Sequence, residues 1–147
     1  MTAAQLEAQY GPPNAAYLSA NCIMWEVQED YPWFPAKVIY INKVFKDMLF
    51  NSLAAVQAAG LQGEIHSFDG CYNDRDVRGA SSLSAHSYAY AVDLNASTNG
   101  MVVNPTPAQR LGTWTQGFID AMTSSGIFFG GNFETRADPM HYSGADL

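Results

Sequence analysis

Apolar residues recur at helical spacing most clearly in the first half of the chain. Asn42 suits the N-cap of a helix that we expect to run to about Ala59. Gly60 then follows where a C-terminal cap belongs. The apolar stripe of this helix consists of Phe45, Met48, Leu49, Leu53 and Val56. A shorter helix is predicted over residues 2–9, before the Gly-Pro-Pro turn at 11–13.

A second long helix is predicted near residue 106. Thr106 is its expected cap, Pro107 takes the first helical position, and Gln109 completes a capping box. We expect this helix to continue without a break until Gly126. Its predicted buried stripe consists of Leu111, Trp114, Phe118 and Met122.

Strand patterns are shorter than these helices. Strands are predicted over residues 37–41, 62–68, 88–94, 127–129 and 140–142. The polar run 71–82 and the turn-rich run 95–105 are expected to be loops. Residues 14–35 are given no regular structure, so the N-terminal segment 1–35 is the part that the sequence leaves undefined. Helices and strands mix without βαβ regularity, which predicts an α+β fold.

Composition narrows the classes of function. At 147 residues, the chain is expected to form a single domain, 1–147, and we expect a monomer. Its net charge is −7 with only 7 Lys and Arg residues, which argues against nucleic-acid binding. An acidic protein also gains no long-range attraction for an anionic substrate, so local groups would have to hold one.

The chain also lacks the signals of a membrane protein. No apolar run has membrane-spanning length, so no membrane insertion is expected. The N-terminus lacks the pattern of a secretory signal, which predicts synthesis in the cytoplasm. Cys22 and Cys71 are too few for a disulfide framework. Two reduced thiols are favoured, and one disulfide remains an alternative if the protein works outside the cell.

Candidate chemistry is concentrated in two stretches, SAHSYAYAVDLN at 84–95 and DPMHY at 138–142. Together they supply His86, Asp93 and His141, which suit one zinc ion with three protein ligands and an open position for water. Asp138 would add a carboxylate base. The third histidine, His66, stands in a predicted apolar strand without an acidic neighbour at ligand spacing, so we expect no catalytic role for it.

Spacing also constrains the backbone at these residues. Seven positions separate His86 from Asp93, an odd number that places them on opposite faces of one straight strand. His86 is therefore expected in a bend just before the strand. Pro139 disfavours helix at Asp138. A tight turn followed by a strand can direct Asp138 and His141 at one point.

These motifs resemble a known family. The runs YNDRDVRG at 72–79, SAHSYAYAVDLN, and FGGNFETRADPMHY at 129–142 look like the zinc D-Ala-D-Ala carboxypeptidase family. That family includes VanY-like carboxypeptidases, vancomycin-resistance dipeptidases and phage L-alanyl-D-glutamate endolysins. The resemblance covers about residues 42–142. It implies a small antiparallel sheet that carries the zinc site between flanking helices, as in hedgehog-like and DD-peptidase-like domains.

The resemblance implies a role for each matching residue. It makes His86, Asp93 and His141 the zinc ligands and Asp138 the general base. It makes Arg75 the residue that stabilises the oxyanion. A fixed cation suits that role because it faces the charge that develops on the carbonyl oxygen. An alternative for Arg75 is a surface ion pair with a neighbouring aspartate.

Other matched positions are expected at the substrate or depart from the family pattern. Ser84 matches the motif serine, which contacts substrate or orients the site. Arg78 is the second candidate for the role of Arg75 and otherwise a substrate-binding residue. Ala89 stands where the family usually has Gly, which narrows the backbone approach and is expected to alter the substrate groove and so the specificity. Two further departures are Phe-Gly-Gly-Asn at 129–132 for Trp-Gly-Gly-Asp and Tyr142 for Phe.

The sequence therefore predicts a zinc metallopeptidase whose partner is the stem peptide of peptidoglycan. The first expectation is an L-Ala–D-Glu endopeptidase of the endolysin type, released onto the cell wall by a holin. A D-Ala-D-Ala carboxypeptidase is the second. A non-catalytic module that binds zinc or wall peptides is the rival from another class, and an intact Asp138 argues against it. A purely structural zinc site would need a fourth ligand, and none is evident.

Overall fold

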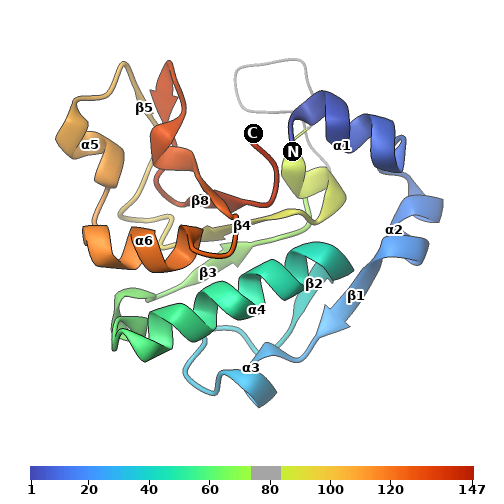
Figure 1. The fold of residues 1–147 in the computed structure, drawn as a ribbon, viewed down its shortest axis with the longest axis horizontal. Helices are drawn as coiled ribbons and strands as arrows, with labels where there is room; N and C mark the ends of the chain where they lie inside the picture. The colour runs from blue at the N-terminus through green and yellow to red at the C-terminus, as the bar shows by residue number, and fades with distance from the viewer. Residues whose placement is uncertain (74–83) are drawn as a thin grey trace.

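The computed structural model describes residues 1–73 and 84–147 of the chain (Figure 1). The α-helices are α1 (Ala3–Tyr10), α2 (Ala15–Asn21), α3 (Val27–Asp30), α4 (Lys43–Ala58), α5 (Pro107–Leu111) and α6 (Gln116–Thr123). The strands are β1 (Cys22–Trp25), β2 (Ile39–Asn42), β3 (Phe68–Gly70), β4 (Ala91–Leu94), β5 (Val102–Val103), β6 (Phe128–Phe129), β7 (Arg136–Ala137) and β8 (His141–Ser143). Short 3-10 helices are η1 (Gln62–Glu64), η2 (Ala85–Tyr88) and η3 (Gly130–Asn132).

A four-stranded antiparallel sheet forms the centre of the fold. Its strand order is β3-β4-β8-β6, and two smaller sheets pair β1 with β2 and β5 with β7. In the central sheet β4 pairs with β8, so that Asp93 lies opposite His141. The α+β class expected from the sequence is confirmed.

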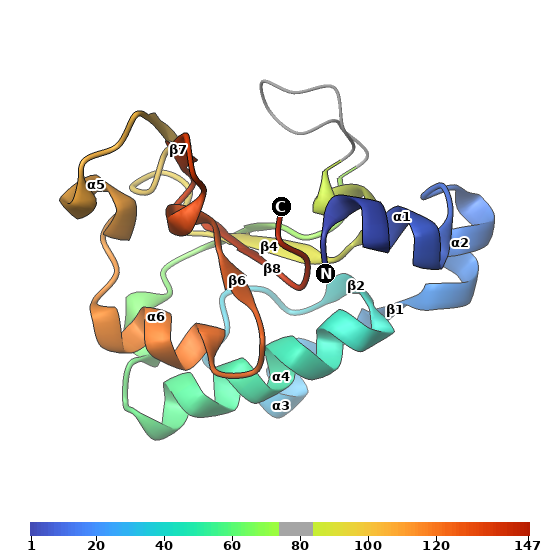
Figure 2. The same cartoon turned by 45° about the horizontal axis from the view of Figure 1, so that its top comes forward.

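Helices cover one face of this sheet. In Figures 1 and 2, α4 and α6 lie side by side below the central strands, while η2, α5 and the β5–β7 pair lie on the opposite side. Ser52 on α4 joins the two helices, since its Oγ donates to the carbonyl oxygen of Met122 on α6 at 2.6 Å. The side of the sheet that the two helices leave uncovered carries the candidate chemistry.

Helix α4 forms as predicted. The Asn42 side chain accepts hydrogen bonds from the N–H groups of Val44 and Phe45, at 2.8 and 3.2 Å, and so caps its first turn. The buried residues of its apolar stripe are Phe45, Leu49, Leu53 and Val56. Met48, the other stripe position, is half-buried. These residues belong to one continuous hydrophobic core.

The second predicted helix is wrong in its length. The capping box of Thr106 and Gln109 is present, but α5 ends at Leu111 and a new helix, α6, starts after Thr115. Gly112 causes the break because its φ of 57° is not helical. Asn99 holds this turn, since its Oδ1 accepts from the Thr113 N–H at 2.8 Å. Leu111 is consequently 36% exposed, instead of buried.

The strand predicted over residues 62–68 is also wrong. Residues 62–64 form η1, and only the end of the predicted run enters β3. The side chain of Asn95 explains this, because its Oδ1 accepts from the N–H groups of His66 and Ser67 at 2.7 and 3.1 Å. Its Nδ2 donates to the carbonyl oxygen of Glu64 at 2.7 Å. A side chain thus takes the hydrogen bonds that a neighbouring strand would have made, and His66 is exposed outside any strand.

The N-terminal segment contains more regular structure than the sequence indicated. Residues 14–35 hold α2, β1 and α3, and the predicted loop 95–105 contains β5. These elements are short and depend on distant partners. The Tyr17 hydroxyl on α2, for example, donates to the carbonyl oxygen of Tyr88 at 2.7 Å. Cys22 and Cys71 are buried free thiols. Within the described ranges, no helix is both long enough and apolar enough to cross a membrane.

Candidate metal centre

The bend that carries His86 is built by the residues on either side of it. Ser84 caps η2, and its Oγ accepts from the His86 N–H at 3.2 Å. Ala89 ends η2 with φ 52° and ψ 39°, the left-handed conformation. Because of this reversal, β4 begins only at Ala91 and the strand predicted over 88–94 is shortened. The expected bend before the strand is present.

Asp93 and His141 are brought together by strand pairing. They are directly opposite each other on β4 and β8. A tight turn leads into β8, because the His141 N–H donates to the carbonyl oxygen of Asp138 at 3.0 Å. This is the turn followed by a strand that Pro139 suggested. The pairing register of the sheet therefore decides where His141 lies.

The three predicted ligands meet in a small buried space. His86 Nε2 lies 3.2 Å from Asp93 Oδ1, and His141 Nδ1 lies 3.4 Å from the same oxygen. One ligand atom from each residue lies within 4.8 Å of the other two. The Asp93 side chain is only 13% exposed, and both imidazoles are less exposed than that. The structure thus forms a group of three side chains that can hold a metal ion.

The tautomers of both histidines follow from their outer partners. His86 Nδ1 lies 2.7 Å from the carbonyl oxygen of Cys71, and His141 Nε2 lies 2.9 Å from that of Leu147. A carbonyl can only accept, so the outer nitrogen of each neutral ring carries the proton. The inner nitrogens then present lone pairs toward the Asp93 carboxylate. Three acceptors converge on one point, which is the arrangement that a metal cation requires of its ligands.

The electrostatics of Asp93 keep it in the ligand form. Burial by itself raises the pKa of this carboxyl. When the inner nitrogens of His141 and His86 carry protons instead of facing a metal, their hydrogen bonds to the carboxylate and the positive charge of the rings outweigh burial. The pKa of Asp93 consequently lies well below its usual range, so the group is a carboxylate at neutral pH.

Asp138 lies beside the centre in the turn before His141. Its N–H donates to the carbonyl oxygen of Gly130 at 2.9 Å, and its own carbonyl accepts from His141. The residue is half-buried, between β7 and β8. Asp138 therefore lies in the turn that leads to His141 and is not one of the three converging groups.

The Gly-Gly pair packs against this turn. A Cβ on Gly130 would lie 2.5 Å from the carbonyl oxygen of Asp138 and 2.9 Å from His141 Cβ. A Cβ on Gly131 would lie 2.1 Å from the carbonyl oxygen of Arg110. Only glycine allows η3 to approach so closely, so the sequence Gly130-Gly131 fixes the Asp138–His141 turn as well as making a turn of its own.

The remaining predicted site residues differ in what the structure says of them. Ser84 is buried and orients His86 through the cap of η2. Arg75 and Arg78 lie outside the described residues, so their predicted roles stay predictions. Ala89 is fully buried, and its effect is on the backbone turn instead of on an open groove surface. His66 is exposed and outside the converging group.

Three contributors to the centre were not predicted from the sequence. The carbonyl oxygens of Cys71 and Leu147 fix the two imidazoles. The ring of Phe133 packs against the His141 ring, with centroids 5.6 Å apart. Every residue has a main-chain carbonyl, so no sequence signal marks the two that matter. Phe133 lies in the recognised motif run, but an aromatic residue there is equally compatible with ordinary packing.

Comparison with known proteins supports the family resemblance of the sequence motifs. Residues 78–144 match a family model described as D-alanyl-D-alanine carboxypeptidase. The matched region contains all three converging residues and Asp138, which confirms the resemblance seen in the motifs. No curated protein and no solved structure matches the chain significantly.

Proposed function

We propose that the chain is a zinc-dependent peptidase that cleaves the stem peptides of peptidoglycan. The observation that carries the proposal is the convergence of His86 Nε2, His141 Nδ1 and the Asp93 carboxylate, with both outer imidazole nitrogens held by carbonyls. The match over residues 78–144 supports peptidase chemistry of the D-alanyl-D-alanine carboxypeptidase type.

The donor set fits zinc better than a hard cation. Two imidazole nitrogens and one carboxylate are typical of catalytic zinc sites, which keep a fourth position for water. Calcium and magnesium prefer oxygen ligands. When bound, zinc lowers the pKa of a bound water to about 7 and polarises a carbonyl.

The protein residues would then direct protons and charge. Asp138, next to His141, would accept the proton of the attacking water and pass it to the leaving amine. Arg75 would face the oxygen of the reacting carbonyl, with Arg78 as the second candidate for that role. Ser84 would orient His86 or contact the substrate. The intact base favours an enzyme over a non-catalytic binding module.

The bond cleaved is the finer part of the proposal. We propose the bond between L-Ala and D-Glu, as in endolysins that reach the wall after release from the cytoplasm. A groove of about 610 Å³ lies along β6 and α6, and its lining includes Phe133, whose ring packs against that of His141. Such a groove supports binding of residues beyond the cleaved bond, as an endopeptidase needs. The D-Ala-D-Ala bond is the second candidate, and the description of the matching family supports it.

A digest of purified peptidoglycan tests the proposal. Mass spectrometry should find stem peptides released from the glycan strands, with new D-Glu N-termini. Release of terminal D-Ala alone would show that the enzyme cleaves the D-Ala-D-Ala bond instead of the L-Ala–D-Glu bond. His141→Ala should lose zinc and activity together, whereas the control His66→Ala, at an exposed histidine, should keep both. A wild-type protein that holds zinc but cuts neither bond would make it a binding module.

A further inference from the structure

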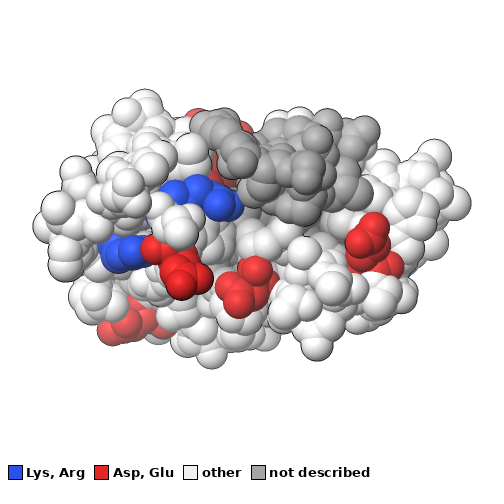
Figure 3. All heavy atoms as spheres, turned by 90° about the horizontal axis from the view of Figure 1, so that it is seen from above, with Lys and Arg blue, Asp and Glu red and all other residues white. Residues whose placement is uncertain are grey.

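Positive charge is scarce in this protein, so the few cations near the metal centre are informative. The chain has 7 Lys and Arg residues and a net charge of −7. Figure 3 shows basic side chains on one part of the face seen from above, and one group of them lies directly beside acidic side chains. An anionic substrate therefore gains little from the overall field and needs a local cation at its binding site.

Two described arginines, Arg110 and Arg136, come from the elements on this side of the sheet. The guanidinium of Arg110 is occupied, because it donates to the carbonyl oxygens of Gly131, Phe133 and Glu134 at 3.1, 2.6 and 3.0 Å. It holds the loop after η3 in place. Arg110 therefore has a structural role.

Arg136 is different in its contacts. Its Cζ lies 5.0 Å from the ring centroid of Phe133, which in turn packs against His141 with centroids 5.6 Å apart. Within residues 1–73 and 84–147, the side chain of Arg136 makes no hydrogen bond or ion pair, although its backbone pairs with β5. The half-buried guanidinium is thus held by an aromatic ring beside a metal ligand, while its donors are available.

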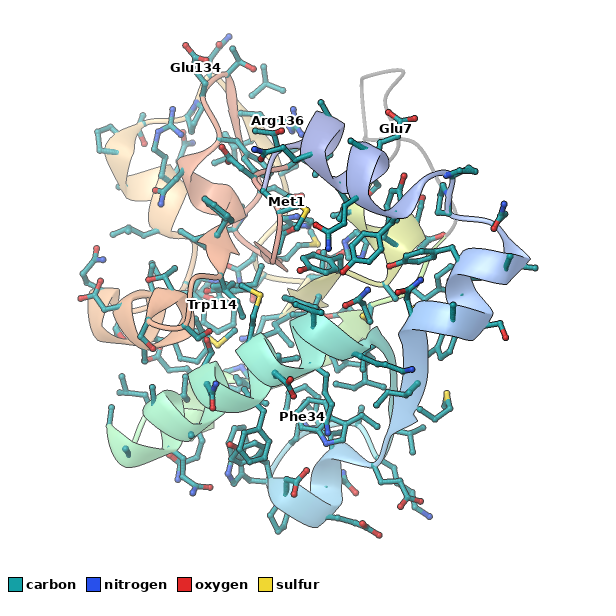
Figure 4. All side chains as sticks on the ribbon, turned by 45° about the vertical axis from the view of Figure 1, so that its right-hand side comes forward. Met1, Glu7, Phe34, Trp114, Glu134 and Arg136 are labelled. Carbon is teal, nitrogen blue, oxygen red and sulfur yellow. The ribbon has the colours of Figure 1, made fainter. Side chains whose placement is uncertain are left out.

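The strand directs this side chain away from the core. Successive residues of a strand point to opposite faces, so Arg136 points away from the side on which Ala137 is fully buried. Figure 4 shows the Arg136 side chain projecting from the β7 region. The Phe133 ring, which contacts both Arg136 and His141, therefore places the guanidinium close to the candidate metal centre.

We propose that Arg136 is a substrate-binding residue that pairs with a carboxylate of the peptide, within about three residues of the cleaved bond. The reach follows from the two ring contacts of 5.0 and 5.6 Å, since an extended peptide advances about 3.3 Å per residue. This inference rests on the proposed peptidase function. Stem peptides carry such groups, on D-Glu and at the C-terminal D-Ala.

The chemistry of arginine suits this role. Its planar guanidinium can make two parallel hydrogen bonds to one carboxylate, and stacking on Phe133 holds that plane in a fixed orientation. Less side-chain freedom is then lost when substrate binds. Because Phe133 contacts His141 as well, the same ring relates the position of the carboxylate to that of the metal centre.

Matched peptides test the pairing. The substrates are stem tetrapeptides and pentapeptides that carry either a free carboxylate or an amide at D-Glu, and separately at the C-terminus. If Arg136 binds a given carboxylate, wild type should cleave the peptide that carries it with a kcat/KM about tenfold to a hundredfold higher than for the matched amide peptide. Arg136→Met should lose that preference, mainly through KM, and Arg136→Lys should keep part of it. The arm that shows the preference identifies the carboxylate.

The control variant is Lys46→Met. Lys46 also places its cation over an aromatic ring, with Nζ 5.7 Å from the centroid of Trp25, but it lies on α4, on the other side of the sheet. The Lys46→Met variant also removes one positive charge and should keep the preference for the acid peptide. A merely structural Arg136 would lower activity on acid and amide alike. An unchanged acid-to-amide ratio of kcat/KM in Arg136→Met overturns the inference. Equal cleavage of both peptides by wild type overturns it as well. A wild type that cleaves no peptide overturns the proposed function itself.

Discussion

His141 donates its Nε2–H to the main-chain carbonyl of Leu147 across 2.9 Å. This bond fixes which imidazole nitrogen faces Asp93. The segment that supplies the carbonyl is itself anchored, because the Asp146 N–H donates to the carbonyl oxygen of Met1 at 2.6 Å and Ala145 is fully buried. Leu147 therefore acts as the outer partner of a candidate metal ligand.

Removal of Asp146 and Leu147 should weaken zinc binding about tenfold to a hundredfold, because His141 loses the acceptor that orients its ring. Competition with a chromophoric chelator measures this affinity. Leu147→Ala is the matched control, since it keeps the carbonyl and should bind zinc like the wild type. Equal affinity in the truncated chain would show that the Leu147 carbonyl does not position His141.

Asp138→Asn should keep zinc and lose about 10²–10⁴-fold in turnover, because the amide cannot accept the proton of the attacking water. Metal analysis and the rate on muropeptides are measured on the same sample. Asp47→Asn, at an exposed aspartate on α4, makes the same chemical change away from the site and should be neutral. Loss of metal in Asp138→Asn would instead identify Asp138 as a ligand.

Tyr142→Phe should stabilise the protein by about 1 kcal/mol. The Tyr142 hydroxyl is buried and has no hydrogen-bond partner among the residues that the structure describes, so the change removes an unsatisfied polar group. The midpoint of thermal unfolding should rise by about 2–4 °C. Tyr17→Phe is the opposite case, because that hydroxyl donates to Tyr88 and accepts from Asn42. It should be destabilising, and a loss of stability in Tyr142→Phe would mean that its hydroxyl has a partner.

Ala89→Gly should also stabilise the fold slightly, by up to about 0.5 kcal/mol. Ala89 has a φ of 52°, which costs a residue with a Cβ about 1 kcal/mol and costs glycine little. Part of this gain is offset because glycine has more freedom in the unfolded chain. Urea titration measures the difference. Ala91→Gly, in the ordinary backbone of β4, should be destabilising, so a similar effect of both changes would count against the strain at Ala89.

Features that depend on neighbours in sequence were predicted well. The cap at Asn42, the capping box at Thr106 and the bend at His86 each arise from interactions within a few residues. The motif spacing also identified the three converging side chains, because the donor types that suit zinc are few and their order along the chain carries the information. Local chemistry was sufficient in these cases.

Tertiary packing decided the rest. The sequence around Gly112 is compatible with a continuous helix until Asn99 bonds the next turn, and residues 64–67 read as a strand until Asn95 takes their hydrogen bonds. The carbonyls of Cys71 and Leu147 become partners of the two imidazoles only when distant segments pack together. These contacts depend on the register of β4 against β8, which sets the position of His141. A main-chain carbonyl is the same in every residue, so only the folded chain decides which ones orient the metal ligands.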